Sequence, residues 1–385
     1  MPSAATARRA AARPDSRAEP SVAAQGEAFA VGRWALGCVA ALATVGLVTA
    51  VSAAPPGEAW VTLGMHAVHL ALGVTAFLAA YSLPVETVRR WAPVGAGLLF
   101  LLLVAMLVTP LGYESHNARR WLRMGPISLQ PSLFFQLLWP VIASSWVARD
   151  PLRLRSLREM SKLAGVFLFC MLPVFLQPDL GSVMILLMVT GMAFLFAGAP
   201  RKALLVLIPA MLLAVWVATL LFPHVGERLN WLNEESYQVA QGKAAFERGG
   251  LFGQGPGQGV MKFGHVPEGE TDFVMPLIAE EWGLAGTLTV WSLFAAFTLL
   301  GFRTARRART RYGIVLMATA TVMVSFQAAY NLGMVTGLLP VKGLPLPFVS
   351  RGGSSVLALS ALLGVALRAA QADRRARGPA TELVS

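Results

Sequence analysis

Residues 91–112 read Trp-Ala-Pro-Val-Gly-Ala-Gly-Leu-Leu-Phe-Leu-Leu-Leu-Val-Ala-Met-Leu-Val-Thr-Pro-Leu-Gly and contain no charged side chain. An α-helix needs about 20 consecutive apolar residues to cross a bilayer. Runs of this kind recur along the chain and predict an all-α, polytopic membrane protein with about ten transmembrane helices. We place the spans at residues 34–53, 60–83, 91–112, 133–148, 162–176, 181–199, 203–222, 274–301, 313–335 and 352–370.

The composition of the 385-residue chain supports this fold class. Charged residues make up 14% of the chain and hydrophobic residues 56%, whereas soluble domains carry about 25% charged residues. The first span is too long, and lies too far from the N-terminus, for a simple cleaved signal peptide. The sequence predicts a disordered basic tail over 1–32, one membrane domain over 33–370 and a C-terminal tail over 371–385.

The distribution of charge predicts the orientation in the membrane. The net charge of +12 could suggest nucleic acid as a partner. With the N-terminus in the cytoplasm, however, 23 of the 32 Lys and Arg residues fall in inner segments and 9 in outer ones. This is the asymmetry expected of a membrane protein, and it makes nucleic acid an unnecessary partner. It places both termini inside and the large loop 223–273, between spans seven and eight, outside.

The outer basic residues lie in three loops of unusual sequence. In the first, Arg119 and Arg120 stand beside Trp121. Arginine binds phosphate through two parallel hydrogen bonds and tryptophan favours the membrane interface, so this group suits a pyrophosphate or a lipid headgroup. Ordinary interfacial anchoring is the alternative.

The second loop, 223–273, is long for a membrane connection, and long loops are commonly functional. Residues 236–247 have the pattern of a short amphipathic helix lying on the interface. Residues 249–259 contain six glycines and no nucleotide-binding Gly-Lys-Ser/Thr motif follows them. Glycines can permit close backbone approach, or they can simply make the loop mobile.

The third loop, 337–355, contains three prolines and four glycines, which prevent a continuous helix. Non-helical backbone at membrane depth must be buried in protein or line a wet cavity. We therefore expect a re-entrant or pocket-lining segment here.

Three carboxylates, Asp272, Glu280 and Glu281, lie at the start of the eighth span. Carboxylates at this depth are costly and commonly mark a functional site. From the residues alone, an N-cap of the following helix is the favoured role of Asp272. His66 and His69 share a helix face, but without a third ligand they do not predict a metal site.

Several motifs, in their order along the chain, resemble those of the SEDS (shape, elongation, division and sporulation) family of peptidoglycan glycosyltransferases. They are Asn117 to Trp121, Gln130-Pro131-Ser132, Gln177 to Ser182, Pro267-Glu268 with Thr271-Asp272-Phe273, Glu280-Glu281, and Gly337 to Ser355. Lys262, before the Pro-Glu motif, favours the FtsW (division) branch slightly over the RodA (elongation) branch.

The resemblance implies a ten-span enzyme that polymerises lipid II outside the bacterial cytoplasmic membrane. By resemblance, Asp272 is the general base that deprotonates the 4-hydroxyl of the acceptor sugar, and Glu280 and Glu281 structure a polar cavity. The resemblance also implies a divalent cation, Mg²⁺ or Mn²⁺, with unknown ligands. The substrate-binding residues expected from the motifs and loops are Arg119, Arg120, Trp121, Gln130, Ser132, Asp179, Lys262, Glu268, Thr271, Lys342, Ser350 and Ser354.

The resemblance further implies partners: a class B penicillin-binding protein as transpeptidase, and other division or elongation membrane proteins. The chain contains no Ser-x-x-Lys sequence of its own, which serine transpeptidases need. Three residues depart from the family pattern, because Leu133, Gln136 and Arg351 replace its Glu, Lys and Tyr. A lipid II transporter (flippase) and a non-enzymatic scaffold for a transpeptidase remain alternative functions.

Overall fold

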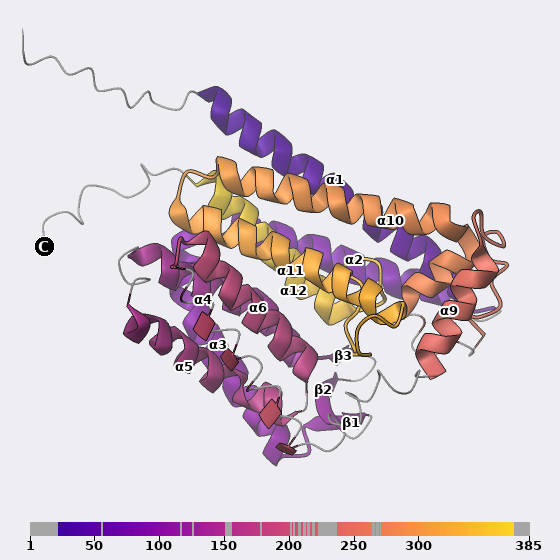
Figure 1. Ribbon diagram of the computed structural model, residues 1–385, viewed down its shortest axis with the longest axis horizontal. Coiled ribbons are helices and arrows are strands. Elements are labelled where there is room, and N and C mark those ends of the chain that lie inside the picture. Colours follow the sequence, from indigo (N-terminus) through magenta and orange to yellow (C-terminus); the bar gives the residue numbers. More distant parts are fainter. Residues whose placement is uncertain are drawn as a thin grey trace, which may run out of the picture.

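The computed structural model is a bundle of long helices with a small sheet at one end (Figure 1). It describes residues 22–54, 57–115, 118–124, 127–150, 156–177, 179–200, 237–263 and 271–372, together with isolated positions between 202 and 221 and the residues Val266 and Gly269.

The described helices confirm the all-α, polytopic fold class. Among these residues, eight helices are long and apolar enough to cross a membrane, and α6 is a shorter apolar helix. The predicted seventh span, 203–222, falls largely outside the described residues. The helices are α1 (Val22–Ala53), α2 (Ala59–Ser82), α3 (Val85–Val108), η1 (Pro131–Phe134), α4 (Phe135–Arg149), α5 (Leu157–Leu176), α6 (Leu180–Phe196), α9 (Tyr237–Gly249), α10 (Val274–Arg307), α11 (Arg311–Val335) and α12 (Gly353–Gln371).

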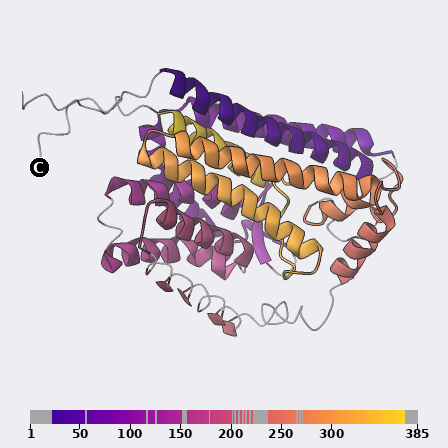
Figure 2. The same cartoon turned by 45° about the horizontal axis from the view of Figure 1, so that its top comes forward.

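One boundary differs from the sequence prediction. Helix α1 begins at Val22, so residues 22–32 of the predicted N-terminal tail are helical. Residues 1–21 and 373–385 lie outside the described residues. Helix α9 matches the amphipathic helix predicted at 236–247 and packs against α10 (Figure 2).

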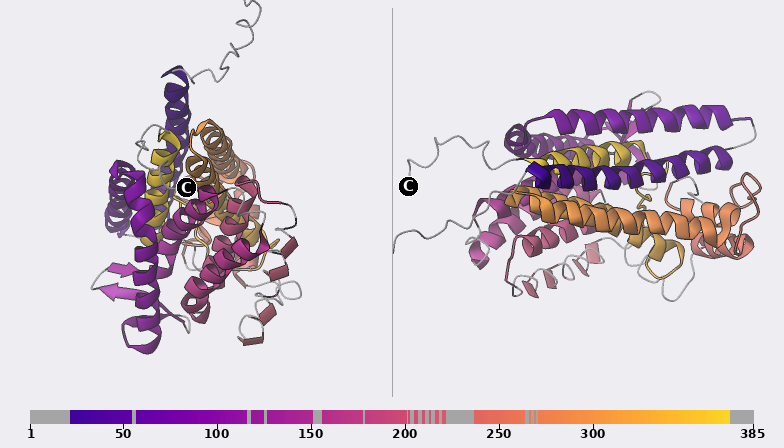
Figure 3. Two further views of the ribbon diagram at one scale, coloured as in Figure 1. Left: turned by 90° about the vertical axis from the view of Figure 1, so that its left-hand side faces the viewer. Right: turned by 90° about the horizontal axis from the view of Figure 1, so that it is seen from above.

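The first outer loop, which contains Arg119, Arg120 and Trp121, instead forms a three-stranded antiparallel sheet, β1 (Gly112–Ser115), β2 (Ala118–Met124) and β3 (Ile127–Leu129). Figure 3 shows strands projecting beside the bundle. Tyr113 and Trp121 are direct partners across β1 and β2, and such aromatic pairs stabilise antiparallel strands. Strands β1 and β3 have only four and three residues, and the sequence of β2 does not alternate polar and apolar residues, so the sequence carries no clear strand signal here.

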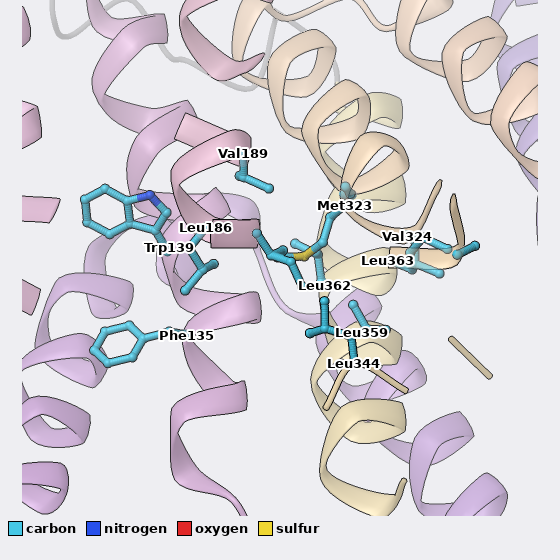
Figure 4. Packing of buried hydrophobic residues seen from close by; sticks show 14 of the residues in the cluster. Phe135, Trp139, Leu186, Val189, Met323, Val324, Leu344, Leu359, Leu362 and Leu363 are labelled. Carbon is cyan, nitrogen blue, oxygen red and sulfur yellow. The ribbon is translucent and has the colours of Figure 1, made fainter. Parts of the chain in front are cut away.

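The core lies where α4 and α6 meet α11 and α12. Phe135 and Trp139 of α4, with Leu186 and Val189 of α6, lie on one side of this contact (Figure 4). On the other side, Met323, Val324, Leu359, Leu362 and Leu363 are buried. The Trp139 indole donates a 2.7 Å hydrogen bond to Thr190, which satisfies its polar edge inside the apolar packing.

Helix α10 is interrupted at Gly283, whose backbone angles are φ 64° and ψ −159°. Beyond this break, α10 and α11 run antiparallel, because Thr298 hydrogen-bonds Ser325 at 2.7 Å and Gly301 lies against Thr321. The contact between Thr298 and Ser325 marks a common level on the two helices. At 1.5 Å per residue, Gly283 lies about 22 Å above this level along α10, whereas Asn331 lies only about 9 Å above it along α11.

Asn331 nevertheless contacts residue 272, since its side chain hydrogen-bonds the Asp272 carbonyl at 2.7 Å. The chain must therefore return by about 13 Å between Gly283 and Asp272, which matches the length of the nine-residue helical segment 274–282. We call this reversal, residues 272–307, the α10 hairpin. It carries Asp272 back alongside α11.

Candidate functional site

Asp272 lies between the short arm of the α10 hairpin and the segment 336–352 that joins α11 to α12. A Cβ atom added to Gly343 would lie 3.2 Å from Asp272 Oδ2, so the carboxylate sits directly against the backbone there. Asn331 Nδ2 donates to the carbonyls of Asp272 (2.7 Å) and Leu344 (2.9 Å) and thereby joins the two segments. The N-cap position of α10 is occupied by Phe273, not by Asp272.

The segment 336–352 is non-helical, which confirms most of the prediction for 337–355, whereas residues 353–355 belong to α12. It is also buried: Leu344, Leu346 and Val349 are each at most 3% exposed, and Lys342 is 7% exposed. Ser350 Oγ accepts a 2.8 Å hydrogen bond from Leu346 N and donates to the Thr271 carbonyl. Thr271, Asp272, Lys342 and Ser350 are thus gathered by one folded connection.

A second polar cluster surrounds Asp179 at the N-terminus of α6. Asp179 Oδ2 accepts hydrogen bonds from Gln130 Nε2 (2.9 Å), Ser132 Oγ (2.9 Å) and Ser182 Oγ (2.8 Å). Its Oδ1 accepts from Ser182 N at 3.3 Å, which makes Asp179 the N-cap of α6. Gln130 N donates to Ser354 Oγ at 3.1 Å, and this bond ties the cluster to α12.

The two groups of residues meet at Leu344. A Cβ atom on Gly181, two residues after Asp179, would lie 3.0 Å from Leu344 Cδ2. The preceding residue, Gly343, is the one that lies against Asp272. Asp179 and Asp272 therefore lie on two sides of one connection, at the same end of the bundle.

The first loop contributes Arg120 to this end. Arg120 Nε donates a 2.7 Å hydrogen bond to the Gln177 carbonyl, two residues before Asp179. Trp121 is held in β2 opposite Tyr113. The side chain of Arg119 and the whole of Glu268 lie outside what the structure describes.

Glu280 and Glu281 lie in the short arm of the α10 hairpin, where they hold the glycine-rich loop. Glu280 Oε1 accepts from Arg248 Nε (3.0 Å) and Val260 N (3.1 Å), and its Oε2 accepts from Met261 N (3.1 Å). Both carboxylates are almost completely buried. A buried carboxylate is stable only when paired and hydrogen-bonded, as Glu280 is here.

Glu281 extends this network to α1. Its Oε2 accepts from Gly257 N at 3.1 Å and from Ser52 Oγ, near the end of α1. Its Oε1 lies 3.0 Å from Lys262 Nζ. We refer to Glu280, Glu281, Arg248, Lys262 and Ser52 as the loop clamp. The resemblance implies that Glu280 and Glu281 structure a polar cavity, and in the structure both carboxylates hold the glycine-rich loop through this clamp.

Lys262 is fully engaged within the loop clamp. Its ammonium group also donates to the carbonyls of Ser52 (2.6 Å) and Gly257 (2.9 Å), so three hydrogen bonds use its three protons. A contact between Lys262 and substrate would require one of these bonds to break. Ser52 and Arg248 were not singled out in the sequence, and their types and spacing give no signal that could have found them.

The glycines of 249–259 allow close packing in this loop. A Cβ atom on Gly259 would lie 2.8 Å from Glu280 Oε2, and one on Gly249 would overlap the Ala279 carbonyl. Of the two explanations that the sequence left open, the structure therefore supports close approach.

Two of the residues that depart from the family pattern are buried together near the start of α4. Leu133 is 8% exposed and Gln136 is 1% exposed. Among the described residues, nothing hydrogen-bonds to Gln136 Oε1. The family pattern has Glu and Lys at these two positions. Losing both members of such a charged pair costs much less stability than losing one, which is consistent with the uncharged pair found here.

The metal expected from the resemblance has no ligand set in the described part of the chain, where no group of three His, Cys, Asp or Glu side chains comes together. The oxygens of Asp179, Glu280 and Glu281 are already occupied by protein donors.

Comparison with known proteins identifies the family. Residues 32–375 match the model of the FtsW/RodA/SpoVE family, described as cell cycle protein. The chain belongs to this family. This confirms the resemblance drawn from the motifs.

Curated relatives carry FtsW names. A protein from Mycobacterium tuberculosis, named probable peptidoglycan glycosyltransferase FtsW, is 32% identical over 351 residues, covering 88% of this chain and 67% of the relative. A protein of the same name from Caulobacter vibrioides is 31% identical, with 87% and 88% covered. These relatives support the lean towards the FtsW branch.

Solved structures share the fold. A chain from a peptidoglycan synthase complex, in work on how polymerization and crosslinking are structurally coordinated, has a TM-score of 0.73 and 27% identity, covering 87% of this chain and 96% of its own. The rod shape determining protein RodA of Thermus thermophilus has a TM-score of 0.65 and 26% identity, covering 87% and 95%.

Proposed function

We propose that this protein is a peptidoglycan glycosyltransferase, which polymerises lipid II into β-1,4-linked glycan strands. The observation that carries the proposal is the placement of the Asp272 carboxylate against Gly343, at the end of the bundle that also holds the Asp179 cluster and Arg120. The names of the relatives support the same activity.

The proposed reaction needs a base and a stabilised leaving group. Asp272 takes the proton of the acceptor 4-hydroxyl, and the resulting oxygen attacks C1 of the lipid-linked donor. The bond between C1 and the pyrophosphate oxygen breaks with inversion, and the polyprenyl pyrophosphate leaves with both electrons of that bond. Arg119, Arg120 and Lys342 are the proposed cations for the developing negative charge.

In the proposed orientation, this site faces outward and both termini lie in the cytoplasm. The support is the excess of Lys and Arg in the segments predicted to be inside. Single cysteines at Ser236 and Ser156 can be tested with an impermeant thiol reagent in intact cells. Labelling only of Ser236→Cys is expected, and labelling only of Ser156→Cys would reverse the orientation.

We further propose a class B penicillin-binding protein as partner. The structural relative from work on coordinated polymerization and crosslinking supports this pairing, as does the missing Ser-x-x-Lys sequence. Co-purification from native membranes is the test, and full activity without any associated transpeptidase would show that the partner is not needed.

The test of the activity itself uses the purified chain with lipid II and a divalent cation in liposomes. Glycan strands should form. The second candidate function is a non-enzymatic scaffold for a transpeptidase, which the uncharged pair Leu133 and Gln136 favours. A well-folded protein that makes no glycan but binds its transpeptidase would support this second function.

A further inference from the structure

A basic cluster on the α2 side of the candidate site, of which His66 is buried and the other members are partly exposed, takes no part in the proposed reaction. It consists of His66 and His69 on α2 and Arg351 just before α12. His66 is 1% exposed, and within the described residues neither of its ring nitrogens has a hydrogen-bond partner. Nδ1 of His69 is buried without a partner in the same way.

The three side chains lie close together. The His69 ring packs on the start of α12, since a Cβ atom on Gly353 would lie 2.9 Å from His69 Nε2. Arg351 Nη2 lies 3.5 Å from the sulfur of Met65, the neighbour of His66. The positive charge of Arg351 also acts electrostatically on both imidazoles.

The cluster is continuous with the candidate site. Arg351 follows Ser350, which bonds to Thr271, and it precedes Ser354, which bonds to Gln130. The cluster lies at the start of α12, and Arg351 is partly exposed there, so a lipid phosphate can reach it from the surface of the bundle.

The chemistry of the cluster favours an anion. A fixed guanidinium charge beside two imidazoles disfavours a metal ion, whereas N–H groups and positive charge together bind phosphate oxygens well. The start of α12 adds to this, because its N-cap, Gly352, offers no side-chain cap and the first N–H groups of a helix attract anions. Buried imidazoles without partners are costly unless a ligand or water satisfies them.

We propose that His66, His69, Arg351 and the N-terminus of α12 bind the phosphate group of a membrane lipid. That phosphate has two sources, an ordinary anionic phospholipid or the polyprenyl pyrophosphate of the substrate, and the second rests on the proposed function. Arg351 is the key residue, because the family pattern has Tyr at this position.

The experiment measures lipid binding to the purified full-length protein by native mass spectrometry. The probes are polyprenyl pyrophosphate and phosphatidylglycerol, with unphosphorylated polyprenol as reference. Arg351→Tyr is the main variant, since it restores the family residue and should fold. The double variant His66→Gln/His69→Gln is the second. Arg90→Gln is the control, because Arg90 is an exposed arginine at the other end of the bundle.

Arg351→Tyr should weaken binding of phosphorylated lipid about tenfold or more, as expected on losing a charge-assisted hydrogen bond. Polyprenol binding, and all binding by Arg90→Gln, should not change. A loss confined to polyprenyl pyrophosphate assigns the site to substrate, and an equal loss for phosphatidylglycerol assigns it to membrane lipid. Unchanged binding of both probes in Arg351→Tyr and in the double histidine variant would overturn the proposal.

This test is independent of turnover. If the protein binds phosphorylated lipid through Arg351 but makes no glycan, the phosphate site is supported and the proposed function is wrong. If the protein makes glycan but its variants bind both probes normally, the proposed function is supported and the phosphate site is wrong.

Discussion

The position of Asp272 depends on Asn331, a residue 59 positions later in the sequence. One amide group holds the carbonyls of Asp272 and Leu344 at the same time, and this fixes the carboxylate against Gly343. The sequence left helix capping as the favoured role of Asp272. The structure weakens that interpretation, because Phe273 occupies the N-cap.

Replacing Asn331 with Leu keeps the volume but removes the donor. Two carbonyls lose their partner, and an unsatisfied buried group costs about 1–3 kcal/mol. We expect a lower melting temperature and slower glycan formation. The control is Thr289→Ala, an exposed hydroxyl that bonds only within its own helix. It should stay within about 0.5 kcal/mol of the original stability. Wild-type stability and activity in Asn331→Leu would show that this amide does not position Asp272.

Among the elements, the α10 hairpin brings Asp272 into the site, and Gly283 makes its turn. The backbone angles of Gly283 belong to a region that is nearly exclusive to glycine. A Cβ atom there would also lie 2.6 Å from the Leu251 carbonyl. Gly283→Ala should therefore open the hairpin and abolish polymerisation. Gly191→Ala in α6 has open space around it and should be neutral or slightly stabilising. If Gly283→Ala melts like the wild type and stays active, the reversal is not needed.

The loop clamp contains a buried ion pair through which its contribution to stability can be tested. Lys262 and Glu281 are each 5% exposed at the side chain. Removing one partner of a buried pair costs about 3–5 kcal/mol. Lys262→Met should therefore destabilise the protein strongly. The double variant Lys262→Met/Glu281→Leu should be more stable than Lys262→Met, because it leaves no unpaired buried charge.

The exposed pair Lys162–Glu159 is the matched control. Lys162→Met should change stability by less than about 1 kcal/mol, as is typical of surface pairs. Denaturation of the purified variants gives the comparison. Equal small effects for Lys162→Met and Lys262→Met would show that the clamp does not hold the loop.

At the scale of the whole molecule, the sequence was sufficient for the membrane fold because long apolar runs have one stable outcome in a bilayer. It also identified the segment 336–352 and the polar residues around Asp179 through their motifs. It could not reveal the α10 hairpin, since Gly283 looks like any glycine inside an apolar helix. Nor could it reveal the clamp, because Ser52 and Arg248 are brought to Glu281 and Glu280 only by tertiary packing.

The most direct test of the whole account is glycan formation from lipid II by Asp272→Asn. The change keeps the size of the side chain and removes its basic oxygen, and asparagine caps helices about as well as aspartate. The variant should melt like the wild-type protein and form no glycan. Wild-type polymerisation by a well-folded Asp272→Asn protein would contradict the assignment of Asp272 as the base.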